Sequence, residues 1–110
     1  MSILPGKQAA IERMGSPEMY HEVAASFAAT LPGSADAITK AIDLQHWEEA
    51  RRLIHSLKGN CASLGADGLR QTVSALEKAC AAGNAELVEK LITAVCQQLP
   101  RLREELLAHK

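Results

Sequence analysis

Aromatic side chains are scarce in this chain of 110 residues, where Phe, Tyr and Trp together make up 3% of the sequence. They occur once each, as Tyr20, Phe27 and Trp47. Hydrophobic residues nevertheless make up 47% of the chain, so a core must consist mainly of Ala, Leu, Ile and Val. Such side chains suit helices that pack closely against one another, and the composition therefore predicts an all-α fold.

Long apolar runs and an excess of one charge are also missing. No stretch approaches the roughly 18 apolar residues of a membrane-spanning helix, and no positively flanked hydrophobic leader begins the chain. We therefore expect a cytoplasmic protein without direct membrane insertion. The formal net charge is −1, and no stripe of Lys and Arg alternates with aromatic residues, which argues against nucleic acid as a partner.

Cysteine is present only as Cys61, Cys80 and Cys96, an odd number with wide spacing. A disulfide framework is therefore not indicated. Each cysteine falls on an apolar or small-residue face of a predicted helix, which favours buried structural thiols. A redox role for Cys61 is the alternative.

A di-metal centre in a helical bundle needs repeated Glu-x-x-His pairs and additional glutamates. Glu18-x-x-His21 has this spacing, but a second such pair is missing. Asp43-x-x-His46 is the nearest approach and lies at a helix end, while His109 is almost at the terminus. We therefore predict no metal site.

The length suits a single domain over residues 1–110. Within residues 1–15, a weak helical pattern from Pro5 to about Met14 predicts a short N-terminal helix. Residues 16–108 carry four longer apolar patterns with short connections, which predict an antiparallel four-helix bundle.

Caps and glycines mark the expected helix ends. In chain order, the expected N-caps and C-terminal glycines are Gly15, Ser16, Gly65, Asp67, Gly83 and Asn84. Pro17 after Ser16 strengthens the start of the second helix. Pro32-Gly33 either kinks that helix or separates two helices, and Pro100 should bend the last helix.

Helical rotation of about 100° per residue assigns each side chain to a face. The second helix is expected to bury Tyr20, Val23, Ala24, Phe27 and Leu31, and the last helix to bury Leu87, Leu91, Val95, Leu99, Leu102 and Leu106. A third helix should open at Trp47 and run to about Leu64, with Ile54, Leu57, Cys61 and Leu64 facing the core. The same rotation places His55 and Gly59 on its solvent-facing side.

Gly59 requires an explanation, because glycine inside a helix costs about 0.5 to 1 kcal/mol relative to alanine. A missing side chain next to His55 would let the surface of a partner approach the imidazole. Lys58 lies three residues after His55 and can bring its ammonium over a phosphoryl group on the ring. Neutral imidazole is a competent nucleophile that needs no metal, so these residues suggest a phosphate-handling histidine.

The run His55-Ser56-Leu57-Lys58-Gly59, with Leu64-Gly65-Ala66 after it, closely resembles the signature of histidine phosphotransfer (HPt) domains of multistep two-component phosphorelays. Upstream, residues 16–20 and Trp47-Glu48 resemble HPt modules attached to hybrid sensor kinases, and Leu76-Glu77 fits downstream. The likeness covers most of residues 16–100. His46 departs from it, since many members carry an acidic helix cap there, and weakens the expected cap.

The resemblance implies a carrier that moves a phosphoryl group between the aspartates of two receiver domains. It assigns His55 as phosphoacceptor, Lys58 to phosphate charge stabilisation and Gly59 to steric access. An apolar surface beside His55 with a charged rim should meet one helix of the receiver. The candidate docking residues are Arg51, Arg52, Ser56, Asn60 and Ala62. A monomer without a cofactor of its own is expected, with Mg²⁺ in the receiver and a hybrid sensor kinase as a further partner.

Two other functions remain as alternatives. One is a helical scaffold that only binds partners, against which the intact His55, Lys58 and Gly59 argue. The other is the dimerisation bundle of a sensor kinase. Ser56 stands where those kinases commonly carry an acidic residue, and the chain has no Gly-rich nucleotide-binding region.

Overall fold

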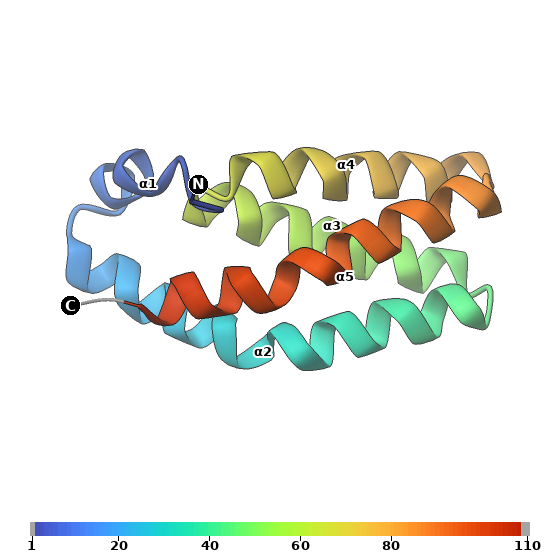
Figure 1. The fold of residues 1–110 in the computed structure, drawn as a ribbon, viewed down its shortest axis with the longest axis horizontal. Helices are drawn as coiled ribbons and strands as arrows, with labels where there is room; N and C mark the ends of the chain where they lie inside the picture. The colour runs from blue at the N-terminus through green and yellow to red at the C-terminus, as the bar shows by residue number, and fades with distance from the viewer. Residues whose placement is uncertain (1, 109–110) are drawn as a thin grey trace.

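The computed structural model describes residues 2–108, and these residues form five α-helices and no strand (Figure 1). The helices are α1 (Lys7–Met14), α2 (Pro17–Asp43), α3 (Trp47–Leu64), α4 (Asp67–Ala82) and α5 (Ala85–Leu107). The predicted all-α fold is confirmed. Met1 and His109 lie outside the described residues. The expectation for His109 as a metal ligand therefore falls outside them too.

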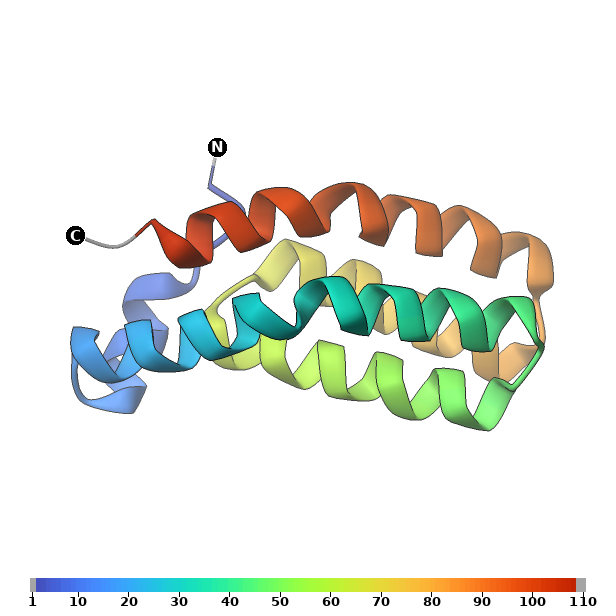
Figure 2. The same ribbon diagram turned by 90° about the horizontal axis from the view of Figure 1, so that it is seen from below.

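The four long helices lie side by side, and each one runs in the opposite direction to the helix before it (Figures 1 and 2). Contacts join α2 to α3, α3 to α4, α4 to α5 and α5 back to α2. Each long helix therefore packs against two others around a shared apolar core. The short helix α1 packs against α2 and α3 at one end of the bundle.

Two of the three expected N-caps are confirmed. The Ser16 hydroxyl accepts a hydrogen bond from the Met19 N–H at 3.1 Å, and the Asn84 side-chain oxygen accepts one from the Leu87 N–H at 3.2 Å. Asp67 as a cap is wrong, because the Ala66 carbonyl already accepts the first bond of α4 from Arg70. Asp67 is instead the first residue of α4. Its negative charge there interacts favourably with the positive end of the helix dipole.

Pro32 and Gly33 kink α2 and do not divide it. The helix continues through both residues from Pro17 to Asp43, and Figure 1 shows it bending near its middle. Proline has no N–H to bond the preceding turn, which accounts for the bend. The α5 helix likewise continues through Pro100.

The predicted apolar faces are buried with three corrections, one of which is that Leu91 of α5 is only half-buried. Val23 in α2 is 40% exposed and Leu87 in α5 is 41% exposed, although both were expected in the core. Their neighbours Ala24 and Val88 are 0% and 1% exposed. In α2 the buried stripe therefore excludes Val23, and in α5 it begins at Val88, one position after the predicted Leu87. In α3 the expected apolar residues Ile54, Leu57, Cys61 and Leu64 are buried, and so is Ala50. Trp47 is half-buried against the core.

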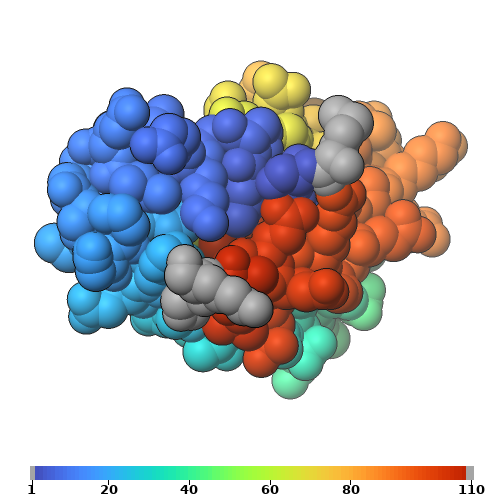
Figure 3. Space-filling view, turned by 60° about the vertical axis from the view of Figure 1, so that its left-hand side comes forward, coloured from blue at the N-terminus to red at the C-terminus, as the bar shows by residue number. Residues whose placement is uncertain are grey.

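The N-terminal segment is attached to the end of the bundle (Figure 3). Glu105 of α5 accepts hydrogen bonds from the Ser2 hydroxyl at 2.6 Å and from the Ile3 N–H at 3.2 Å. The Gly6 N–H donates to the Gly65 carbonyl at 2.8 Å. Gly65 has φ +86°, and a Cβ on it would overlap the backbone of Gly6. This close approach therefore requires glycine at the end of α3.

We predict that Gly65→Ala destabilises the protein more than Gly83→Ala. Both glycines have positive φ, +86° and +69°, but a Cβ at Gly83 would meet nothing within 4 Å. The control variant Gly83→Ala should lose only about 1 to 2 kcal/mol of unfolding free energy, from backbone strain. Gly65→Ala should lose about 3 kcal/mol or more, because overlap adds to strain. Urea denaturation measures both, and equal losses would show that the contact with Gly6 adds nothing to stability.

Candidate functional site

His55 lies in the middle of α3, and its side chain is 68% exposed. The buried neighbours Ile54 and Leu57, at 0% and 3% exposure, fix the orientation of the helix. The predicted solvent-facing position of the imidazole is therefore confirmed.

The carboxylate of Glu77 in α4 holds both His55 and Lys58. Its Oε2 lies 2.9 Å from Nδ1 of His55, and its Oε1 accepts a hydrogen bond from Nζ of Lys58 at 2.6 Å. The bond from Lys58 lowers the pKa of Glu77 below its ordinary value, His55 adds to this effect, and partial burial opposes it. Glu77 is therefore ionised at neutral pH.

An ionised carboxylate only accepts hydrogen bonds, so Nδ1 of His55 must be the donor. In the neutral imidazole only one ring nitrogen carries a proton, and this assigns the proton to Nδ1. Nε2 then keeps its lone pair, on a side chain that is 68% exposed. This lone pair gives the ring one atom that can act as a nucleophile.

Lys58 is partly buried, with 27% of its side chain exposed, and its ammonium is occupied by Glu77. Its expected action on a phosphoryl group stays a prediction. In the sequence, Glu77 belongs only to the family resemblance, with no role assigned to it. Its place beside the buried Leu76 was visible in the sequence, but the pairing with His55 depends on how α3 and α4 align.

A Cβ added at Gly59 would meet nothing within 4 Å. No packing contact inside the described part of the chain therefore demands glycine at this position. An external reason, such as access to the neighbouring His55, fits this open surface.

Of the predicted docking residues, Arg51 and Arg52 are paired on their own helix. Nη1 of Arg51 lies 3.5 Å from Oε1 of Glu48, and Arg52 forms an ion pair with Glu49. Ser56 and Asn60 are exposed and Ala62 is half-buried. Their docking roles remain predictions.

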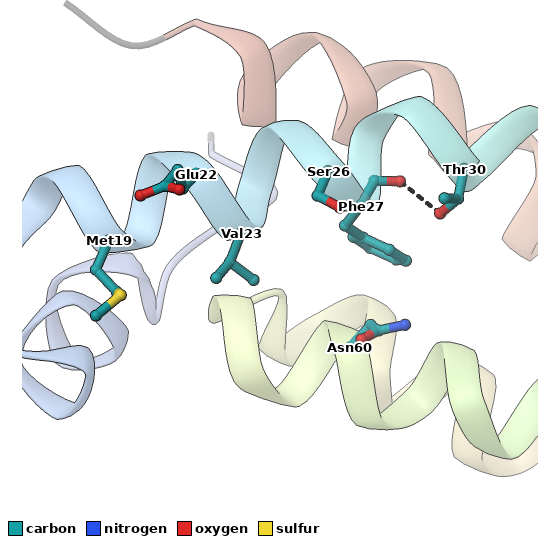
Figure 4. Close-up of a pocket in the computed structure, with 7 residues that line it drawn as sticks. All are labelled: Met19, Glu22, Val23, Ser26, Phe27, Thr30 and Asn60. Carbon is teal, nitrogen blue, oxygen red and sulfur yellow. Dashed lines mark hydrogen bonds between the residues drawn. The ribbon is translucent and has the colours of Figure 1, made fainter.

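A groove between α2 and α3 is lined almost entirely by side chains of α2 (Figure 4). Its lining residues are Met19, Glu22, Val23, Ser26, Phe27, Thr30 and Asn60. Met19 and Val23 are 51% and 40% exposed, so the groove presents apolar side chains to solvent. The helical pattern of apolar residues did not reveal this surface, because the pattern placed Val23 in the core. Asn60, predicted for docking, supplies the α3 side of the groove.

The cysteines differ in burial. Cys61 and Cys80 are 0% and 4% exposed, as predicted, whereas Cys96 is only half-buried. Burial raises the pKa of the Cys61 thiol to about 12. Reactive thiolate is therefore scarce at neutral pH, and the structure does not support a redox role for Cys61.

Within residues 2–108, no three His, Cys, Asp or Glu side chains lie close enough together to hold a metal ion. Within the same residues, none of the helices has the length and apolar character needed to cross a membrane.

Residues 22–107 match the sequence model of the family described as Hpt domain. The match includes all of α3, α4 and α5 and most of α2, but it begins after α1. No curated protein and no solved structure matches the chain.

We predict that Glu77→Gln lowers the unfolding free energy at pH 7 by about 1 kcal/mol, the range of a partly exposed ion pair. The folded-state pKa of Glu77 lies below the ordinary value of 4.5, so its contribution is complete above that pH and disappears as pH falls through the folded-state pKa. Wild type and variant should therefore converge in acid. Denaturation curves from pH 7 to pH 3 test this.

Glu104→Gln provides the matched control, since Glu104 is exposed on α5 and forms no ion pair within residues 2–108. It should leave stability almost unchanged at every pH. A stability difference between Glu77→Gln and wild type that stays constant down to pH 3 would contradict the assigned ion pairs.

Proposed function

Since this chain belongs to the Hpt domain family, we propose that His55 accepts a phosphoryl group from a receiver phosphoaspartate. His55 then passes the group to an aspartate of a second receiver. Members of the family act in phosphotransfer within two-component phosphorelays. The observation that carries the proposal is the exposed imidazole whose Nδ1 is held by Glu77, leaving Nε2 free. The partners are receiver domains and a hybrid sensor kinase, in the cytoplasm.

In the first transfer, the Nε2 lone pair attacks phosphorus and the bond between phosphorus and the aspartate oxygen breaks. The electron pair of that bond returns to the receiver as a carboxylate. The ring keeps the Nδ1 proton and becomes a phosphorylated imidazolium, which the Glu77 carboxylate stabilises from 2.9 Å. In the second transfer a carboxylate oxygen attacks, the P–N bond breaks and neutral His55 is restored.

Little catalytic power is required of this chain. Phosphoryl transfer depends on in-line positioning and neutralisation of charge, which we assign mainly to the receiver and its Mg²⁺. Lys58 assists when its ammonium turns from Glu77 toward the phosphoryl oxygens. The chain is thus a phosphocarrier without a cofactor of its own and without autonomous kinase activity.

The proposed docking surface joins the α3 face around His55 to the groove between α2 and α3. Met19 and Val23 supply its exposed apolar contacts, and Asn60 supplies a polar one. Arg51, Arg52, Ser56 and Ala62 complete the candidate contacts. A receiver helix would lie against this surface. The long helices serve as a rigid antiparallel four-helix bundle that supports it, and the chain acts as a monomer.

The central experiment incubates the chain with a phosphorylated receiver domain and follows phosphate that is labile in acid and stable in base, as expected for phosphohistidine. His55→Gln should reduce incorporation to background because it removes the nucleophile. His46→Gln, which changes an exposed histidine at the start of α3, should accept phosphate like wild type. Undiminished incorporation into His55→Gln would overturn the proposed function.

A second experiment tests access. Gly59→Leu should slow transfer by about tenfold or more, since a side chain would stand between His55 and an incoming receiver. The variant should still fold, because a Cβ there meets nothing within 4 Å. Gly33→Leu is the matched control, with equally open surroundings in α2. Equal transfer rates for both variants would remove the explanation for Gly59.

A further inference from the structure

The short helix α1 precedes the residues that match the family, yet it is fixed to the bundle at several points. The segment before it is held by hydrogen bonds to Glu105, and Gly6 bonds to Gly65. At the other end of α1, Nη2 of Arg13 donates a hydrogen bond to the Ala62 carbonyl of α3 at 3.3 Å. The position of Arg13 is therefore defined relative to the candidate site.

Arg13 lies over the same face of α3 as His55. Ala62 follows His55 by seven residues, which at 3.6 residues per turn corresponds to almost two complete turns and about 10 Å along the helix. The bond to Ala62 thus places the guanidinium of Arg13 on this face, toward the carboxyl end of α3.

The charge of Arg13 is not paired, unlike that of the other cations on this face. Arg51, Arg52 and Lys58 each form an ion pair with a carboxylate of this chain. Arg13 is exposed and forms no ion pair within residues 2–108. Asp67 lines the same shallow hollow as Arg13 without pairing with it. One guanidinium N–H bonds to Ala62, and the remaining donors are available to a partner.

We propose that Arg13 extends the receiver-docking surface onto α1 and binds a carboxylate at the rim of the receiver, which makes it a specificity-determining residue. The inference rests on the proposed function. An ordinary interface buries about 800 Å² on each partner, a patch roughly 30 Å across. Ala62, to which Arg13 bonds, lies about 10 Å along α3 from His55, so a patch centred on His55 includes this end of the helix. A cation at this rim acts mainly on the rate of encounter and on its dependence on salt.

The test measures the second-order rate of phosphoryl transfer from one phosphorylated receiver domain to the full chain. At about 50 mM salt, Arg13→Glu should lower this rate about tenfold and Arg13→Lys less than about twofold. At about 300 mM salt the difference should shrink because screening weakens the attraction. Arg103→Glu is the matched control, an exposed arginine of α5 without an ion pair within residues 2–108. It should change the rate less than about twofold.

Binding without chemistry provides a second measurement. In a His55→Gln background, Arg13→Glu should raise the Kd for the receiver about tenfold, with an unchanged circular dichroism spectrum as evidence of folding. An equal loss with Arg13→Lys would assign Arg13 a purely structural role at Ala62 and overturn the proposal. Equal transfer rates for Arg13→Glu and Arg103→Glu would also overturn the proposal. Failure of wild type to accept phosphate would instead overturn the proposed function, and this inference with it.

Discussion

The alignment of α3 with α4 is the constraint on which the candidate site depends. Leu57 and Leu76 are both buried in the shared core, and rotating either helix would expose them. Each such side chain contributes about 1.5 to 3 kcal/mol, more than the 1 kcal/mol or less of a partly exposed ion pair. Core packing therefore decides the alignment. His55, Lys58 and Glu77 lie one or two positions from these leucines and meet as its result.

Glu77 has opposite effects on the two charges that phosphorylation would create. Its carboxylate favours a positive imidazole ring, but it repels the phosphoryl oxygens and competes with them for Lys58. A positively charged ring is also a better leaving group than a neutral one. Such a balance suits a carrier, because a phosphoryl group held too tightly would not be passed on.

Features set by local chemistry could be predicted from the sequence. The hydroxyl of Ser16 capping α2 and the outward direction of His55 depend only on nearby residues, and both predictions are confirmed. Val23 and Leu87 were misplaced because periodicity alone does not say at which residues the edges of a buried stripe lie. The role of Glu77 could not be derived, since it lies 22 positions from His55 and meets it only through tertiary packing.

The hydrogen bond between Ser2 and Glu105 joins positions 103 residues apart and so closes a loop of almost the whole chain. The contacts between consecutive long helices close much shorter loops and can form earlier at a smaller loss of conformational entropy. The N-terminal segment should therefore dock late in folding and detach first in local unfolding. Brief opening of this segment would remove α1 from the proposed docking surface while leaving His55 and Glu77 in contact.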